Sequence, residues 1–146
     1  MGNVRNILES KSREIFSIPP ETIFYHALEI MHDKNVSALV VMKRDKLAGI
    51  FTERDYARKV ILKGRSSKDT QVIEIMTSPV IYVTPQETVD DCMRMMTTNR
   101  VRHLPVVEDE KVVGIVSIGD LVNWVVSAQA DAISQLHSYI TGTYPG

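Results

Sequence analysis

GIFTERDYARKV, residues 49–60, decides the fold, because its pattern returns 65 positions later as GIVSIGDLVNWV, residues 114–125. Gly, Ile, a hydroxyl residue and Asp occupy the same four places in both stretches. Each stretch starts at the end of an apolar run typical of a strand and continues with the spacing of a helix. The repetition indicates that one structural unit is written twice.

The similarity extends far beyond these twelve residues. Residues 15–61 align with residues 80–126 without a gap, and the apolar blocks, turns and chain breakers keep the same order. The segments that precede them, NVRNILES at residues 3–10 and QVIEIMTS at residues 71–78, also match. We therefore expect two copies of the same unit, with domain boundaries at 1–66 and 67–130.

Each copy reads as five pieces. Short strands are predicted at Ile15–Ile18 and Val80–Val83, each followed by a proline that suits a turn or a helix start. An amphipathic helix, two strands joined by a polar turn, and a helix that begins near Thr52 or Ser117 complete the unit. The predicted fold class is α+β, with two β-α-β-β-α repeats packed through their sheets about a pseudo-two-fold axis. Such packing leaves a cleft between equivalent loops, where a small ligand can bind.

The hydroxyl-to-Asp spacing has a purely structural interpretation. Thr52 is suited to cap a helix, with Asp55 reaching back to the cap, and Ser117 and Asp120 can do the same. Capping does not explain why Gly and Ile precede the hydroxyl at the same distance in both copies. This interpretation stays open beside a functional one.

The functional interpretation starts from the same geometry. A helix N-terminus offers free N–H groups to a phosphate, and a carboxylate one turn later has two oxygens for the paired hydroxyls of a ribose. Gly49 and Gly114 would let a ring approach the backbone. Together these features describe a site for a nucleoside phosphate.

With GIFTERD and GIVSIGD, and with the strand motifs NVSALVV and RVRHLPVV in repeat order, the chain resembles a tandem pair of CBS (cystathionine β-synthase) domains, a Bateman module. The resemblance runs from residue 4 to about residue 126. It implies a stand-alone, non-enzymatic regulatory module that senses adenosine-containing ligands such as AMP, ADP, ATP or NAD. It also implies that a ligand binds in the cleft between the repeats and that the change passes to an effector protein.

The resemblance also assigns roles by position. Asp55 and Asp120 would hold ribose, and Thr52 and Ser117 would contact ribose or phosphate. Adenine would lie between Ile50 or Ile115 and the backbone near Phe16 or Ile81. The positions that face phosphates are Ser37, Ala38, Arg102 and His103.

Charge distinguishes the two copies. Arg102 and His103 stand in the second copy where the first has Ser37 and Ala38, whereas Arg54 belongs to the first copy alone. Charge-assisted hydrogen bonds from these cations would influence which phosphate chain is preferred. We therefore expect the two sites to prefer different ligands. Arg58 is expected to be a solvated surface charge.

Composition narrows the remaining possibilities. A net charge of −1 gives no global attraction for nucleic acid or for a membrane surface, and one cysteine, Cys92, forms no internal disulfide. The sequence has no apolar run long enough for a membrane helix or a secretory signal, so we expect a cytoplasmic protein. It also shows no metal-ligand spacing and no nucleophile–base pair, so neither a metal site nor catalysis is predicted.

The C-terminal residues 131–146 are predicted to extend the last helix. Ile133, Leu136 and Ile140 form a narrow apolar stripe along it. The stripe either folds back on its own domain or pairs with the same helix of a second chain. The second possibility predicts a homodimer. An assembly protein whose hydroxyl–Asp motifs are only helix caps is the alternative function.

Overall fold

A computed structural model describes the backbone of residues 2–11 and 15–141, with side chains up to residue 138. The first copy contains α2 (Phe24–Lys34) between β1 (Ser17–Ile18) and β2 (Ala38–Lys43), then β3 (Lys46–Thr52) and α3 (Glu53–Tyr56), which continues as a π-helical turn, Ala57–Ile61. The second copy contains α4 (Val89–Asn99), β4 (His103–Glu108), β5 (Lys111–Ser117) and α5 (Ile118–Thr141). Helix α1 (Val4–Glu9) and a 3-10 turn, Val72–Glu74, precede the respective copies.

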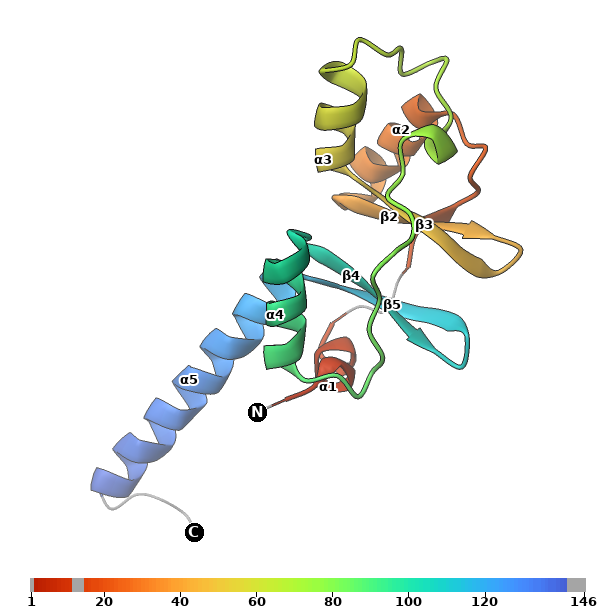
Figure 1. Cartoon of the computed structure of the whole chain (residues 1–146). Coiled ribbons are helices and arrows are strands. Elements are labelled where there is room, and N and C mark those ends of the chain that lie inside the picture. Colours follow the sequence, from red (N-terminus) through yellow and green to blue (C-terminus); the bar gives the residue numbers. More distant parts are fainter. Residues whose placement is uncertain (1, 12–14, 142–146) are drawn as a thin grey trace.

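The two copies form two small sheets that meet through β3 and β5 (Figure 1). In the first sheet β1 lies parallel to β2, and β2 is antiparallel to β3. In the second sheet β4 and β5 are antiparallel, with a register shift at the position that matches the shift in the first. The predicted α+β class and the tandem arrangement are confirmed.

The strand predicted at Val80–Val83 does not form, and only Ser17–Ile18 of its predicted counterpart is a strand. In the first sheet the N–H of Val40 donates to the carbonyl of Phe16 over 3.2 Å. The residue that matches Val40 is Pro105, which has no N–H to donate. Val83 keeps a single bridge to β4, so one proline accounts for the missing strand.

Backbone conformation repeats as faithfully as the sequence does. The helices α2 and α4 both end at a residue with left-handed backbone, Asn35 at φ 53° and Arg100 at φ 55°. The hairpins β2–β3 and β4–β5 each turn through two such residues, Arg44–Asp45 and Asp109–Glu110. Two consecutive positive φ values are the signature of a type I′ hairpin turn.

The segments that lead into the copies cross over. Val4, Ile7 and Leu8 of α1 belong to the core of the second copy, whereas Val72 and Ile75 belong to the core of the first. The domain boundaries stay predictions, and the packing adds that each lead-in covers the opposite repeat.

The crossing also explains the two repeated glycines. A Cβ on Gly49 would lie 2.5 Å from Sδ of Met76, and one on Gly114 would lie 2.6 Å from Cδ2 of Leu8. The space above each glycine is therefore filled by a lead-in side chain. The prediction that the glycines make room for a ligand ring is wrong.

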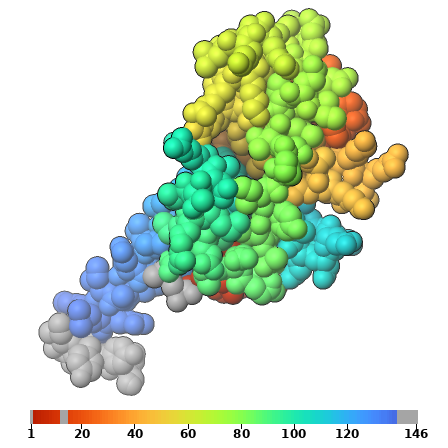
Figure 2. Space-filling view, viewed as in Figure 1, coloured from red at the N-terminus to blue at the C-terminus, as the bar shows by residue number. Residues whose placement is uncertain are grey.

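Helix α5 leaves the body of the molecule along its length, as the blue helix in Figures 1 and 2 shows. Leu121, Trp124 and Val125 pack on the core of the second repeat. Farther along, Ile133 is 68% exposed and Leu136 is 60% exposed, so this part of the stripe does not fold back. The side chain of Ile140 lies outside the described residues.

Candidate functional site

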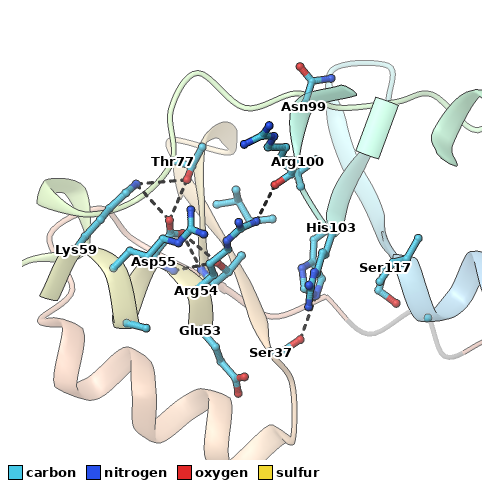
Figure 3. A pocket seen from close by; sticks show the side chains of 18 residues that line it. Ser37, Glu53, Arg54, Asp55, Lys59, Thr77, Asn99, Arg100, His103 and Ser117 are labelled. Atoms are coloured by element: carbon cyan, nitrogen blue, oxygen red, sulfur yellow. Dashed lines mark hydrogen bonds and ion pairs between the residues drawn. The ribbon is translucent and has the colours of Figure 1, made fainter. Parts of the chain in front are cut away.

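A cavity of about 960 Å³ lies between the two repeats and is lined by residues of both (Figure 3). Of the residues predicted to bind a ligand, the cavity wall includes Ser37, Ile50, Thr52, Arg54, Asp55, Arg102, His103 and Ser117. Five predicted residues are absent from this wall: Phe16, Ala38, Ile81, Ile115 and Asp120. The cavity is therefore centred on the first hydroxyl–Asp pair, here called the Asp55 site.

Thr52 and Asp55 form a complete helix cap. The carboxylate oxygen Oδ2 of Asp55 accepts the N–H of Thr52 at 3.0 Å and its hydroxyl at 3.2 Å, while the N–H of Asp55 lies 3.3 Å from the Thr52 oxygen. The side chain of Asp55 is 10% exposed. The capping interpretation is thus structurally correct for this motif, and it fixes the carboxylate at the cavity wall.

The second oxygen of Asp55 faces residues that the sequence reasoning missed. Oδ1 accepts the hydroxyl of Thr77 at 3.1 Å and lies 3.2 Å from the ammonium of Lys59. Lys59 also donates to the carbonyl of Ile75 at 3.1 Å. Thr77 stands in the lead-in to the second repeat, so its contact depends on the crossing of the lead-ins, for which the hydrophobic pattern carries no signal.

The second hydroxyl–Asp pair, here called the Asp120 site, forms a similar cap. Oδ2 of Asp120 accepts the N–H of Ser117 at 2.9 Å, and the N–H of Asp120 donates to the Ser117 hydroxyl at 3.1 Å. Lys11 adds a salt bridge to the same oxygen at 2.7 Å. Burial alone would raise the pKa of Asp120, but the bonds from Lys11 and Ser117 outweigh it and lower the pKa.

Cations gather on one cavity. Its wall carries Arg54, Arg58, Lys59, Arg100 and Arg102, against the acidic side chains Glu53 and Asp55. Arg54 donates to the carbonyl of Arg100 at 2.9 Å and so connects the two repeats. Arg58, predicted to be a solvated charge, is exposed and lines the cavity. The charges that the sequence placed in different copies therefore face one space.

His103 lies at the boundary between the repeats, where Nε2 is 3.0 Å from the hydroxyl of Ser37. Burial lowers the pKa of His103; the nearby Asp120 opposes the shift, and Lys11 and Arg102 reinforce it. The lowered pKa favours the neutral imidazole at pH 7 in the unliganded protein. The role of His103 toward a phosphate stays a prediction, and its hydrogen bond to Ser37 depends on the tautomer.

The remaining predicted residues hold other places. Phe16 packs beside the core of the first repeat, with the ammonium of Lys34 5.5 Å from its ring centre. Ala38 is buried in β2 and pairs with Thr52, whereas Ile81 is 36% exposed in the segment before α4. The carbonyl of Ile115 accepts a bond from Lys11 at 3.1 Å.

The model of the CBS domain matches residues 4–62 and 72–127 of this chain. The chain belongs to the CBS-domain family. Its CBS domain-containing relative CBSX3, mitochondrial, from Arabidopsis thaliana is 42% identical over 97% of this chain and 73% of that protein. Both repeats of the tandem pair are thus accounted for.

Solved CBS structures superpose closely on this chain. A CBS-domain protein from Burkholderia ambifaria has a TM-score of 0.84 and 48% identity, covering 87% of this chain and 96% of that one. The CBS domain pair of protein MJ0100, solved with 5′-methylthioadenosine and S-adenosyl-L-methionine, has a TM-score of 0.77 and 28% identity, covering 86% and 97%. These CBS neighbours share the whole tandem architecture.

Two further observations concern the described residues alone. None of the helices in residues 2–11 and 15–141 is long and apolar enough to cross a membrane. Within the same part of the chain, no group of three or more His, Cys, Asp or Glu side chains is arranged to hold a metal ion.

Proposed function

We propose that this CBS-domain chain is a non-enzymatic regulatory module that binds an adenosine-containing ligand, such as AMP, ADP, ATP or NAD, in the Asp55 cavity. The observation that carries the proposal is a cavity with a helix N-terminus and an oriented carboxylate on one wall and arginines of the other repeat opposite. An adenosine ligand joins a ribose, which suits the carboxylate, to an anionic chain, which suits the arginines. The MJ0100 pair, with its two adenosine ligands, supports this ligand class.

Ligand binding would rearrange contacts that cross the cavity. A ribose hydroxyl at Oδ1 of Asp55 takes the place of Thr77, and a phosphate draws Arg54 away from the carbonyl of Arg100. Since Arg54 connects the repeats, its release changes their coupling. A partner protein that binds one arrangement better than the other would respond to the ligand. Energy sensing through an unidentified effector is the regulatory role that follows.

Calorimetry on protein stripped of nucleotide tests the proposal. Titration with AMP, ADP, ATP and NAD should give saturable binding to at least one of them, and Asp55→Asn should weaken it. Absence of binding to all four at millimolar concentration would overturn the ligand proposal. Turnover of a bound nucleotide would overturn the non-enzymatic part.

We also propose that the chain is a homodimer in which α5 supplies part of the contact. Val126, Ile133 and Leu136 are all more than half exposed, and they repeat at the spacing of a coiled-coil seam. Light scattering after truncation before Ile133 is the test. A shift from dimer to monomer is expected, and an unchanged dimer would exclude the seam as the main contact.

The alternative, an assembly protein, is favoured by one specific observation. Both Asp55 and Asp120 complete their helix caps, so the motifs have a structural role without a ligand. This alternative predicts that all four nucleotides fail to bind while the dimer persists. Cytoplasmic placement stays a prediction, and the Arabidopsis relative is named as mitochondrial.

A further inference from the structure

The two aspartates of the hydroxyl–Asp motifs meet different groups from the lead-in segments. At the Asp120 site, the ammonium of Lys11 bonds both to Oδ2 of Asp120 at 2.7 Å and to the carbonyl of Ile115 at 3.1 Å. At the Asp55 site, Thr77 makes the matching contacts. Its N–H donates to the carbonyl of Ile50 at 2.9 Å, and its hydroxyl donates to Asp55 at 3.1 Å. The group that the lead-in supplies is thus charged at Asp120 and neutral at Asp55, where the nearby ammonium belongs to Lys59 of the repeat's own helical segment.

The surrounding charges differ in the same direction. The five Lys and Arg side chains of the Asp55 cavity are Arg54, Arg58, Lys59, Arg100 and Arg102. At a shift of 65 residues, their counterparts around Asp120 are all neutral: Gly119, Asn123, Trp124, Asn35 and Ser37. Among the described residues, Lys11 is the cation in contact with Asp120, and the Asp120 carboxylate neutralises the charge of Lys11. Within the described residues, Lys11 and Lys59 are each paired with a motif aspartate, and four arginines in addition, Arg54, Arg58, Arg100 and Arg102, line the Asp55 cavity.

The cost of admitting a ribose also differs. At Asp55 a ribose hydroxyl replaces the neutral hydroxyl of Thr77, an exchange of similar hydrogen bonds. Lys59 is on the same helical segment as Asp55, is 42% exposed and lines the cavity, so it can turn toward a phosphate. At Asp120 the ribose has to displace a charge-assisted bond whose lysine is 31% exposed. The exchange at Asp120 therefore gives up the attraction between two full charges, whereas at Asp55 one hydroxyl donor to the carboxylate replaces another.

We propose that Lys11 closes the Asp120 site, so that each chain binds one phosphorylated adenosine ligand, in the Asp55 cavity. This proposal rests on the proposed function. Lys11 takes the place of a ligand, because its ammonium donates to the Asp120 carboxylate, which would otherwise accept the ribose hydroxyls, and to the adjacent carbonyl of Ile115. Removing its charge should free Asp120, on which the described part of the chain places no other cation, and such a site suits an uncharged nucleoside rather than a nucleotide.

The experiment uses stripped full-length protein and two probes, ADP and the uncharged nucleoside 5′-methylthioadenosine. Wild-type protein should bind one ADP per chain, and the ADP-saturated protein should take up no nucleoside. Lys11→Met should keep ADP binding within about threefold of wild type and should bind one nucleoside per chain in addition. Relief of a charge-assisted bond should tighten the second site by about 10- to 100-fold.

Matched variants separate the charge of Lys11 from general effects. Lys59→Met removes the other lysine that pairs with a motif aspartate, and it should weaken ADP binding without creating a second site. Lys11→Arg keeps a cation and should leave the Asp120 site closed. Should Lys11→Met have a lowered melting temperature, Lys11→Gln, which keeps a polar chain, provides the same comparison.

Two results would overturn the role of Lys11: two ADP molecules per wild-type chain, or no nucleoside uptake by folded, ADP-saturated Lys11→Met and Lys11→Gln. A wild-type chain that binds neither probe nor AMP, ATP or NAD would reject the proposed function itself. The two failures are thus distinguishable.

Discussion

The two repeats share a backbone but fill it differently. The first has an aromatic cluster, in which Phe24 packs edge-on against Phe51 at 5.5 Å between ring centres. The ring of Tyr56 lies 5.2 Å from that of Phe24 in a tilted arrangement. The corresponding residues of the second repeat are Val89, Val116 and Leu121. The second repeat instead packs Trp124 on its core, at the position where the first has Lys59. One position is thus used for packing in one copy and for the cavity wall in the other.

This exchange explains why the two copies of a duplicated unit differ in the charge they place beside their aspartates. Because Trp124 packs on the core of the second repeat, the position that holds Lys59 in the first repeat holds no lysine here. Asp120 pairs instead with Lys11, which belongs to a different segment of the chain. The first repeat, with its core filled by Phe24 and Phe51, has Lys59 free to line the cavity. Differences in core composition and in site charge are therefore linked.

The largest expected effect comes from removing an aromatic ring. Phe51→Ala should lower the free energy of unfolding by about 3–5 kcal/mol, because Phe51 is fully buried and the loss of its ring leaves a void in the core of the first repeat. The counterpart change, Val116→Ala, should cost about 2 kcal/mol, since fewer buried atoms are lost. Urea unfolding measures both. Equal losses would show that the aromatic cluster gives the first repeat no special stability.

The next effect concerns the cations. Arg102→Ser, which installs the residue type of its counterpart Ser37, should weaken ADP binding by about 1.5–3 kcal/mol through loss of a charge-assisted bond. The change should leave the melting temperature unaltered, because Arg102 is exposed in the unliganded protein. Calorimetry of ADP binding measures the effect, with Arg94→Ser as control, since Arg94 is 76% exposed and is absent from the cavity wall. Equal weakening by both variants would point to a general loss of positive charge rather than to a contact in the cavity.

Sequence alone predicts the repeated parts of this fold well. The alternation of apolar blocks and the positions of Pro20 and Pro85 suffice for the helices and hairpins, because these depend on local spacing. The prediction of a strand at Val80–Val83 was wrong for a local reason as well, because Pro105 has no N–H to pair with that segment. The alignment of Pro105 with Val40 already contains this information. Local chemistry was therefore readable wherever both copies were compared residue by residue.

The contacts that the sequence did not reveal are those between segments far apart in the chain. The pattern of NVRNILES does not indicate that α1 packs on the second repeat, nor does the lead-in at residues 71–78 indicate that it packs on the first. For this reason neither Lys11 nor Thr77 was recognised as a partner of an aspartate. The same crossing assigns Gly49 and Gly114 to packing rather than to ligand access. At the Asp55 site, the contact between Thr52 and Asp55 was predicted from the motif itself, whereas the contact with Thr77 depends on tertiary structure.

The smallest expected effect is a pH dependence confined to one site. Because burial lowers the pKa of His103 below its ordinary value of 6.5, the unfolded chain binds more protons than the folded one between these two pKa values. The free energy of unfolding should therefore fall as pH decreases through this window. His103→Gln should reduce that slope, and the exposed His137→Gln should leave it unchanged.

A bound phosphate reverses the preference of His103, since an anion in the cavity stabilises the imidazolium and raises its pKa. Binding of ADP should then take up a proton and tighten as pH decreases from 8 toward 6. The groups that oppose or assist this change are Arg102, the residue before β4, Lys11 on the lead-in and Asp120 on α5. Calorimetry in buffers of different ionisation enthalpy counts the proton. The counterpart of His103 in the first repeat is Ala38, which cannot titrate, so the proton should be taken up by the second repeat alone. Proton uptake that persists in His103→Gln would show that another group is responsible and that the pH response does not distinguish the two repeats.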